Sequence, residues 1–232
     1  MTTRLKTCAG LVATLSAVSF PLDAQSCARD AMLVFDGSAS MAAPSVQTEG
    51  AQRIDDARQA LAEALPGIAP IRRIGLMTYG PGPENSCDSI NLKFPPIPEA
   101  AQPIMEGLAW LDPNGLTPLT EAVRTAAEVL NYQTTPGIIV LVTDGNDTCG
   151  GAPCALGAEL ARAAANLTVH VIGFRVDTER LGLRSADVHL FPDGISAAKC
   201  LSDQTGGSYV STQTVEQLRD ALRQTLGCAF LS

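Results

Sequence analysis

The stretch "VFDGSASM" (residues 34–41) follows directly on an apolar run and places one carboxylate and two hydroxyls on alternate positions, Asp36, Ser38 and Ser40. In an extended segment, side chains two residues apart point the same way, so these three can converge on one point. The pattern is compatible with a nucleophile, a metal-binding loop or a polar turn that caps the next helix. The rest of the sequence has to decide among these interpretations.

Short β-branched runs alternate with helical stretches along most of the chain, which is typical of a largely parallel sheet covered on both faces. The runs at 31–35, 137–143 and 168–174 are almost continuously apolar, as expected of strands that are buried on both sides. The runs at 73–80 and 89–94 are joined by a segment too short for a crossover helix, so we expect an antiparallel hairpin there. The sequence therefore predicts an α/β fold, Rossmann-like and doubly wound, with a mostly parallel six-stranded sheet, one antiparallel edge hairpin and helices on both faces.

Two of the expected helices have a clear apolar face. Their apolar residues recur three and four positions apart, so that they fall on one side of each helix. These residues are Ile54, Ala57, Leu61 and Leu65 in the first helix, and Val215, Leu218, Leu222 and Leu226 in the last. We expect both faces to pack on the sheet.

Residues 1–24 have the features of a secretory signal peptide. Two basic residues precede the apolar stretch 11–20, which is too short to cross a bilayer as a stable helix, and Ala24 stands at the expected cleavage point. We expect the protein to be exported, either periplasmic or secreted, with one folded domain over residues 27–228. A competing interpretation makes Cys27 a lipid-attachment cysteine, although the residues before it lack the aliphatic side chain that such signals carry.

The net charge limits the class of partner. The chain carries a formal charge of −8, and loss of residues 1–24, which hold two basic residues and one acidic residue, changes this charge to −9. The remaining basic residues are scattered rather than gathered in a patch, so nucleic acid is not an expected partner. No later apolar run is long enough to span a membrane. The sequence does not specify an oligomeric state, and we expect a monomer.

Six cysteines remain after residues 1–24 are removed, and an even number in an exported chain favours disulfides over reactive thiols. Six cysteines allow 15 connectivities. A short flexible spacer favours a bond between Cys149 and Cys154. In a parallel sheet the start of the first strand and the end of the last helix lie at the same edge, which favours Cys27 with Cys228. Elimination then leaves Cys87 and Cys200. The expected pairs are Cys149–Cys154, Cys27–Cys228 and Cys87–Cys200.

Three polar segments stand at or near predicted strand ends, where ligands bind in open parallel sheets. They are "DGSAS" (36–40), "LTPLT" (116–120) and "TDGNDT" (143–148). All of the side chains that could face a common point are hard oxygen ligands, which suit Mg²⁺ in octahedral geometry at about 2.0–2.1 Å. The candidate metal ligands are Asp36, Ser38, Ser40, Thr117 and Asp144.

Together these segments resemble the von Willebrand factor A-type domain, whose metal-ion-dependent adhesion site uses a D-x-S-x-S loop, a distant Thr and a distant Asp. The resemblance extends over residues 27–228 and implies that the three hydroxyls contact the cation, while the two carboxylates bind it directly or through water. The segments 143–154, 170–174 and 199–210 ("TDGNDTCGGAPC", "HVIGF" and "KCLSDQTGGSYV") resemble the bacterial exported branch of the family.

The implied function is capture rather than turnover. Neutral hydroxyls leave the bound cation attractive to an anion, and in this family an Asp or Glu of a partner commonly completes the metal shell. The resemblance therefore implies a non-enzymatic, divalent-cation-dependent protein- or peptide-binding module of the adhesion type. We expect the cation to be Mg²⁺, with Mn²⁺ and Ca²⁺ as alternatives.

Other interpretations remain open for the same residues. The domain could be a structural or assembly module whose metal site is vestigial, or a hydrolase that uses Ser38 or a metal-bound water, although a G-x-S-x-G elbow is absent. Thr117 could instead cap the helix that follows it. We interpret Asp147 as a loop residue, and His170 and His189 as buried or loop residues rather than catalytic ones.

Overall fold

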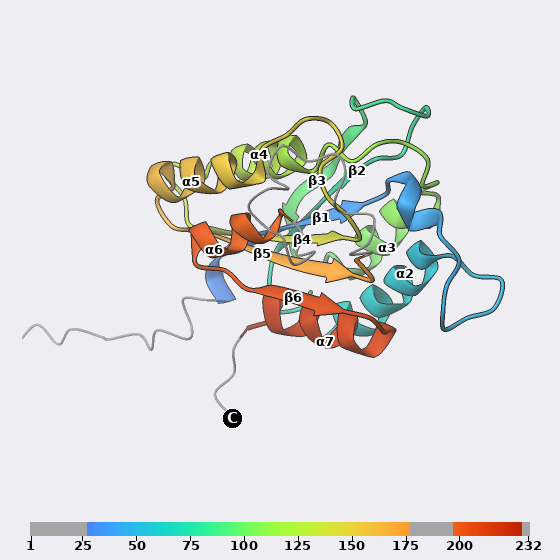
Figure 1. Ribbon diagram of the computed structural model, residues 1–232. Helices are drawn as coiled ribbons and strands as arrows, with labels where there is room; N and C mark the ends of the chain where they lie inside the picture. Colours follow the sequence, from blue (N-terminus) through green and yellow to red (C-terminus); the bar gives the residue numbers. More distant parts are fainter. Residues whose placement is uncertain (1–26, 177–196, 229–232) are drawn as a thin grey trace, which may run out of the picture.

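The structure, a computed structural model, describes residues 27–176 and 197–228 (Figure 1). Six strands form one sheet in the order β3-β2-β1-β4-β5-β6, and every neighbouring pair is parallel except β2 with β3. The strands are β1 (Asp30–Asp36), β2 (Ile74–Tyr79), β3 (Ile90–Ile97), β4 (Gly137–Thr143), β5 (Leu167–Phe174) and β6 (Tyr209–Thr212). The predicted mostly parallel sheet with one edge hairpin is confirmed. The expected signal peptide and His189 lie outside the described residues.

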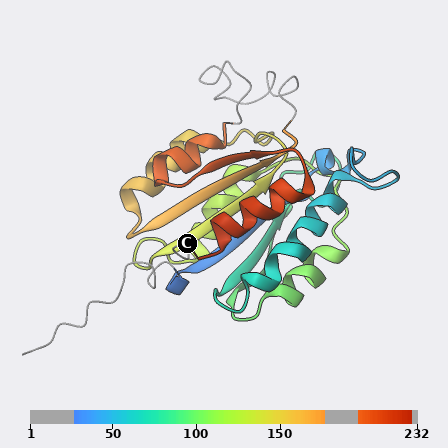
Figure 2. The same cartoon turned by 90° about the horizontal axis from the view of Figure 1, so that it is seen from below.

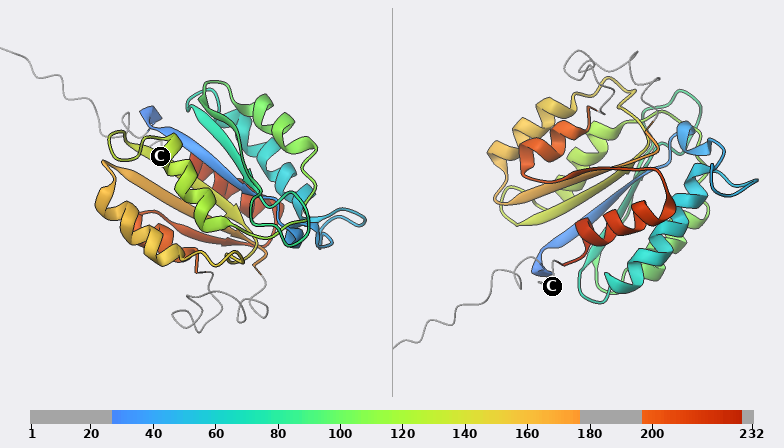
Figure 3. Two further views of the ribbon diagram at one scale, coloured as in Figure 1. Left: turned by 90° about the horizontal axis from the view of Figure 1, so that it is seen from above. Right: turned by 60° about the horizontal axis from the view of Figure 1, so that its bottom comes forward.

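Helices cover both faces of this sheet (Figures 2 and 3). One face carries α2 (Arg53–Ala64), α3 (Ala101–Ala109) and α7 (Val215–Leu226), and the other carries α4 (Leu119–Val129), α5 (Pro153–Ala163) and α6 (Lys199–Thr205). Two short 3-10 helices follow β1 and α2, namely η1 (Ala39–Ala42) and η2 (Leu65–Gly67). Across the described ranges, no helix combines the length and the apolar character that a bilayer crossing requires.

Strand β1 lies at the centre of both cores. Leu33 and Phe35 face the layer of α2, α3 and α7, while Met32 and Val34 face the layer of α4, α5 and α6. This two-sided burial explains why the strand reads as a continuous apolar run rather than an alternating one. The eight apolar residues predicted to line the first and last helices are all buried, which confirms that both apolar faces pack inward.

Helix α3 was not anticipated from the sequence. Pro103 lies within it and reads as a helix breaker, but it occupies the third helical position. The first N–H groups of a helix have no intrahelical acceptor, so the missing donor of this proline costs nothing there. The buried side chains of Ile104 and Leu108 then fix the helix on the sheet.

Of the three predicted disulfides, one is confirmed. Cys27 and Cys228 are bonded with a Cα–Cα distance of 5.3 Å, because the start of β1 and the end of α7 lie side by side at the lower edge of the sheet (Figure 3). The other observed bonds are Cys87–Cys149 and Cys154–Cys200, with Cα–Cα distances of 5.8 and 4.8 Å.

The predicted bonds Cys149–Cys154 and Cys87–Cys200 are therefore wrong. The backbone N–H of Cys149 donates to Asp147 in the loop after β4, whereas Cys154 lies in the first turn of α5, which packs on α6. The spacer between the two cysteines was expected to let them pair with each other. Instead, the packing of α5 on α6 and the hydrogen bonds of the loop place the two thiols next to different partners.

A buried ion pair joins α2 to the residue that follows β5. Arg175 Nη1 donates to Asp56 Oδ2 at 2.5 Å, and the two side chains are 6% and 2% exposed. The hydroxyl of Ser45 donates to the same carboxylate oxygen. Arg175 also donates to Gln47 Oε1 at 2.8 Å, and that oxygen accepts from the N–H of Val215 at 2.9 Å. The pair thus ties the segment before α2 to the start of α7.

Removing one partner of this pair should be costly. Asp56→Ala leaves the Arg175 guanidinium buried without its carboxylate, so we expect the free energy of unfolding to fall by about 3 kcal/mol. Asp203→Ala, which breaks an exposed pair with Lys199, should change it by less than about 0.5 kcal/mol. Urea unfolding followed by circular dichroism measures both. Equal effects of the two substitutions would contradict the role assigned to the buried pair.

Candidate functional site

The candidate site lies at the carboxyl ends of two adjacent strands. β1 and β4 are neighbours in the sheet. The strands that follow β1 in the chain, β2 and β3, lie on one side of this pair, and those that follow β4, β5 and β6, lie on the other side. Such a reversal opens a crevice at the strand ends where ligands bind in α/β sheets. Asp36 is the last residue of β1, and Asp144 directly follows β4.

Four of the five predicted ligands form one connected group of polar contacts. The hydroxyl oxygens of Ser38 and Ser40 are 3.1 Å apart, and the Ser40 hydroxyl donates to Asp144 Oδ1 at 2.6 Å. Asp36 lies behind them, where Oδ1 accepts from the N–H of Ser38 at 2.8 Å and Oδ2 accepts from the hydroxyl of Thr143 at 2.7 Å. Asp36 therefore holds the first loop in position as well as contributing its charge.

Thr117, the fifth predicted ligand, reaches the same edge by a separate route. The bridge between Ser38 and Gly115 places its segment beside the first loop, and the N–H of Ala39 donates to the carbonyl of Gly115 at 2.9 Å. Among the described residues, no hydrogen bond joins the Thr117 hydroxyl to the other four ligands. Thr117 does not cap α4 either, because Pro118 occupies the cap position and the helix begins one residue later.

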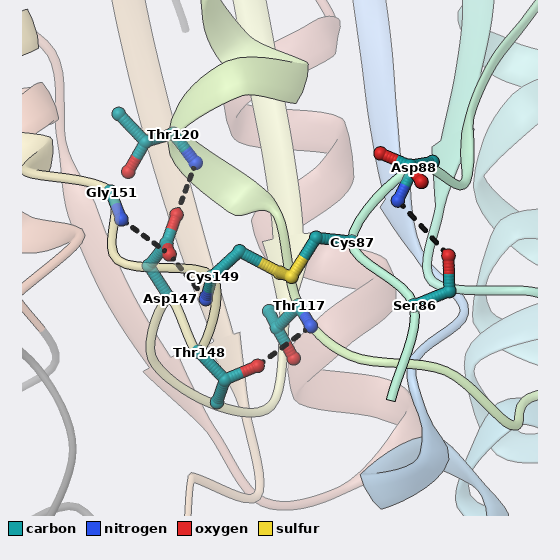
Figure 4. Close-up of a disulfide and its surroundings, with 9 residues drawn as sticks. All are labelled: Ser86, Cys87, Asp88, Thr117, Thr120, Asp147, Thr148, Cys149 and Gly151. Atoms are coloured by element: carbon teal, nitrogen blue, oxygen red, sulfur yellow. Dashed lines mark hydrogen bonds between the residues drawn. A yellow bond between two sulfur atoms is a disulfide. The ribbon is translucent and has the colours of Figure 1, made fainter. Parts of the chain in front are cut away.

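The backbone of Thr117 is held by the third loop, as Figure 4 shows. Its N–H donates to the Thr148 hydroxyl at 2.8 Å, and its carbonyl accepts from the N–H of Thr148 at 3.1 Å. The next residue is Cys149, whose disulfide to Cys87 attaches this loop to the β2–β3 connection. The position of Thr117 therefore depends on a covalent tie between two loops.

Asp147 organises the third loop rather than the ligand set (Figure 4). Its Oδ2 accepts from the N–H of Thr120 at 2.8 Å, and its Oδ1 accepts from the N–H groups of Cys149 and Gly151, both at 2.9 Å. A Cβ on Gly151 would lie 2.3 Å from the Thr120 hydroxyl oxygen, so only glycine fits. Asp147 thus supplies the helix cap for α4, in agreement with its interpretation as a loop residue.

Arg53 is a residue of the candidate site that the sequence did not predict. It is the first residue of α2, and its Nη1 donates to Oδ2 of Asp144, whose side chain is fully buried. A cation at a helix N-terminus opposes the helix dipole, so its presence there is a signal that an acidic partner lies nearby. Arg53 and the Ser40 hydroxyl together occupy both carboxylate oxygens of Asp144.

The site concentrates negative charge in a buried place. Burial and then the negative charge of Asp36 raise the pKa of Asp144 to about 6, while Ser40 and Arg53 act in the opposite direction. Burial and then the charge of Asp36 also raise the pKa of Tyr79, the residue paired with Asp36 in the sheet, well above its usual range. A cation at these carboxylates would be favoured because burial weakens solvent screening.

The donor set fits a hard divalent cation. It offers two carboxylates and several hydroxyls at one edge, which are the ligands that Mg²⁺, Mn²⁺ and Ca²⁺ accept. Within residues 27–176 and 197–228, no cluster of three or more His, Cys, Asp or Glu side chains could hold a metal ion. The donor chemistry alone makes the hydroxyl-rich set a candidate metal centre.

The order of strands and loops at this site has a counterpart in known proteins. A family model described as "von Willebrand factor type A domain" matches residues 31–146, from the start of β1 to the third loop. The chain belongs to this family. The uncharacterized protein YwmD of Bacillus subtilis (strain 168) is 24% identical over 220 residues, which cover 91% of this chain and 90% of YwmD.

Solved structures of low identity share the von Willebrand factor A fold. The pilus adhesin SpaC from Lactobacillus rhamnosus GG is 14% identical with a TM-score of 0.63, and the match covers 85% of this chain and 30% of SpaC. Proximal thread matrix protein 1 from the mussel byssus, in a structure with a zinc-occupied MIDAS motif, is 15% identical with a TM-score of 0.57, over 87% of this chain and 46% of that protein.

His170 lies on β5, away from the candidate site. The N–H of Ser208 donates to its Nδ1 at 3.1 Å, so the ring is held as a neutral acceptor. Burial, and then the nearby positive charges of Arg29 and Arg72, lower the pKa of His170 to about 4. The structure thus gives this histidine a role in the fold.

The depressed pKa of His170 predicts a loss of stability in acid. The unfolded chain binds this proton near pH 6.5 and the folded chain only near pH 4, so the stabilising contribution is lost as the pH falls through this window. The loss should be about 1–2 kcal/mol, after allowance for partial solvent screening.

His170→Gln keeps a side-chain acceptor but does not titrate, so urea unfolding at pH 7 and pH 4 should show a smaller loss for the variant. Carboxylates that titrate in this range, such as Asp144, are present in both proteins. Their contribution to the loss of unfolding free energy is therefore the same in both and cancels when the two losses are compared. Parallel losses in both proteins would contradict the assignment.

Proposed function

We propose that this chain is an exported, divalent-cation-dependent protein- or peptide-binding module of the adhesion type. In this proposal Mg²⁺, or Mn²⁺ or Ca²⁺ in its place, binds to a site formed by Asp36, Ser38, Ser40, Thr117 and Asp144. The ligand is an Asp or Glu carboxylate of a partner protein. The bacterial exported branch of the von Willebrand factor A family is the group to which we assign the chain.

The hydrogen-bonded contacts from Ser38 to Ser40 and from Ser40 to Asp144 are the observation that supports this proposal most directly. Two hydroxyls and a carboxylate from two different loops meet at the reversal of strand order, within 2.6 to 3.1 Å of one another. Asp36 supports the first loop from behind. A polar turn or a helix cap would not need a carboxylate from a distant strand in contact with its hydroxyls.

Each side chain has a distinct role in the proposed binding. A bound cation would supply a positive centre that accepts a carboxylate from the partner. Ser38, Ser40 and Thr117 offer neutral oxygens, so they hold a cation without cancelling its charge. Asp36 and Asp144 supply the negative charge that retains it. With only two carboxylates in the set, little negative charge opposes the approach of an acidic ligand.

Disulfide bonding supports export. All six cysteines of the described chain are paired, and such bonds persist in oxidising compartments. Residues 1–24, the proposed signal peptide, would direct the chain there. We propose that the domain acts in the periplasm or outside the cell, as residues 27–228 and as a monomer.

A second candidate is supported by the contact between Arg53 and Asp144. The guanidinium neutralises Asp144 without any metal, as it would in a structural or assembly module with a vestigial site. Such a module would contact its partner through its surface. Cation binding by the purified protein separates these two candidates.

Calorimetric titration with Mg²⁺ and Mn²⁺ tests the proposal directly. We expect one-to-one binding, and we expect Asp36→Ala and Thr117→Ala each to raise the dissociation constant at least about tenfold, because each removes an oxygen ligand or its support. Asp203→Ala and Thr134→Ala remove an exposed carboxylate and an exposed hydroxyl elsewhere, and they should leave binding unchanged. A dissociation constant that neither site substitution changes, or no binding at all, favours the structural module.

Arg53 should compete with the cation for Asp144. Arg53→Gln removes this competitor, so the dissociation constant for Mg²⁺ should fall by about tenfold. The same variant in EDTA should lose about 2 kcal/mol of unfolding free energy, because Asp144 is left buried without a cation. Arg219→Gln, which changes a partly exposed arginine on α7 that pairs with Asp220, serves as the control. A weaker affinity in Arg53→Gln would instead make Arg53 part of the binding site.

A further inference from the structure

A groove of about 500 Å³ lies between β3, α3 and the β2–β3 loop. Pro81 lines it from the loop, Lys93 from β3, and Glu106, Trp110 and Asp112 from α3 and the segment that follows. This volume is within the range of small ligand sites. None of these residues belongs to the proposed metal site, so the groove needs its own explanation.

Trp110 is the most unusual residue of this groove. It is the only tryptophan of the chain and is 94% exposed, although α3 buries Ile104 and Leu108 completely on its inner side. Exposure of so large an apolar side chain is unfavourable, and tryptophan is enriched at the centres of binding interfaces. Its position on the rim of a groove distinguishes it from an isolated apolar residue on a surface.

The charges around Trp110 favour a cationic ligand. Glu106, Asp112 and Lys93 all line the groove. The side-chain amide of Gln102 donates to Glu106 at 2.7 Å, and within the described chain no ion pair involves any of the three charged side chains. The lining of the groove thus contains two carboxylates and one ammonium group. The face of a tryptophan ring attracts cations as well, and the net negative charge of the chain steers them toward it.

The groove and the candidate metal site share a wall. The segment after Trp110 runs past both, because Leu111 packs so closely on Gly37 that a Cβ there would lie 2.4 Å from it. Four residues later, Gly115 forms the bridge to Ser38, and its N–H donates to the carbonyl of Gly80 at 2.7 Å. One extended ligand could therefore reach from the groove to the metal loops.

We propose that this groove binds a Lys or Arg side chain of the same protein ligand whose acidic group is captured at the metal site. The inference rests on the proposed function for the acidic half of this recognition. The ligand would then carry opposite charges a few residues apart, with the cationic group stacked on Trp110 and paired with Asp112 and Glu106.

The groove can be tested without metal. The oxidised protein, labelled with ¹⁵N, is titrated with N-acetyl-arginine methylamide in EDTA while its NMR spectrum is recorded. We expect saturable shifts of the Trp110 indole N–H and of backbone amides around it. Trp110→Ala should weaken binding about fivefold and Asp112→Asn about threefold, whereas Lys93→Gln should strengthen it about threefold.

Matched substitutions on α6 provide the control. Asp203→Asn and Lys199→Gln change an exposed pair far from the groove in sequence, and they should leave the arginine titration unchanged. The proposal is overturned if arginine produces no shifts at Trp110 or if Lys93→Gln weakens binding. It is also overturned if a neutral disaccharide shifts the same signals while arginine does not, because the groove would then be a glycan site.

The link between the groove and the metal site requires a second experiment. A pentapeptide with one Asp and one Arg is compared in Mg²⁺ with peptides that carry only one of these residues. The two-charge peptide should bind at least about tenfold more tightly than either. Failure of Mg²⁺ binding with arginine binding intact would reject the proposed function and retain the groove. Arginine binding without a gain in the two-charge peptide would reject the link.

Discussion

The parallel pairing of β1 with β4 is the constraint on which the rest of the molecule depends. It places Asp36 beside Thr143, whose hydroxyl donates to the Asp36 carboxylate, and so brings the first and third loops to one point. Because both strands are buried on both faces, their register cannot shift without moving apolar side chains out of two cores. The loops at their ends are therefore attached to strands that are buried on both faces.

Helix α2 takes part in two buried ion pairs, as the cation in one and as the carboxylate in the other. Its first residue, Arg53, supplies a positive charge to Asp144, and three residues later Asp56 receives one from Arg175. The first pair lies at the candidate site and the second pins the segment before α2 to the start of α7. A change at the site that moved Arg53 would thus act on the helix that also holds the α7 contact.

The sequence predicted the features that follow from local patterns. The mostly parallel sheet, its edge hairpin and the apolar faces of the first and last helices depend on periodicity and connection length, which are visible in the chain. Helix α3 and the partners of Cys149 and Cys154 were missed, because a proline at a tolerated position and the packing of α5 on α6 act only in three dimensions. Arg53 was missed because its partner, Asp144, is 91 residues away in the sequence.

The connectivity of the disulfides has a consequence for maturation. If each cysteine joined the next one to emerge during synthesis, the bonds would be Cys27–Cys87, Cys149–Cys154 and Cys200–Cys228, and none of these is native. The native outer bond closes almost the whole chain, so one of its thiols must stay free until the last helix has been made. Any non-native bond formed before that point has to be exchanged through a mixed disulfide. This connectivity therefore makes correct joining sensitive to the isomerising capacity of the compartment as well as to its oxidising strength.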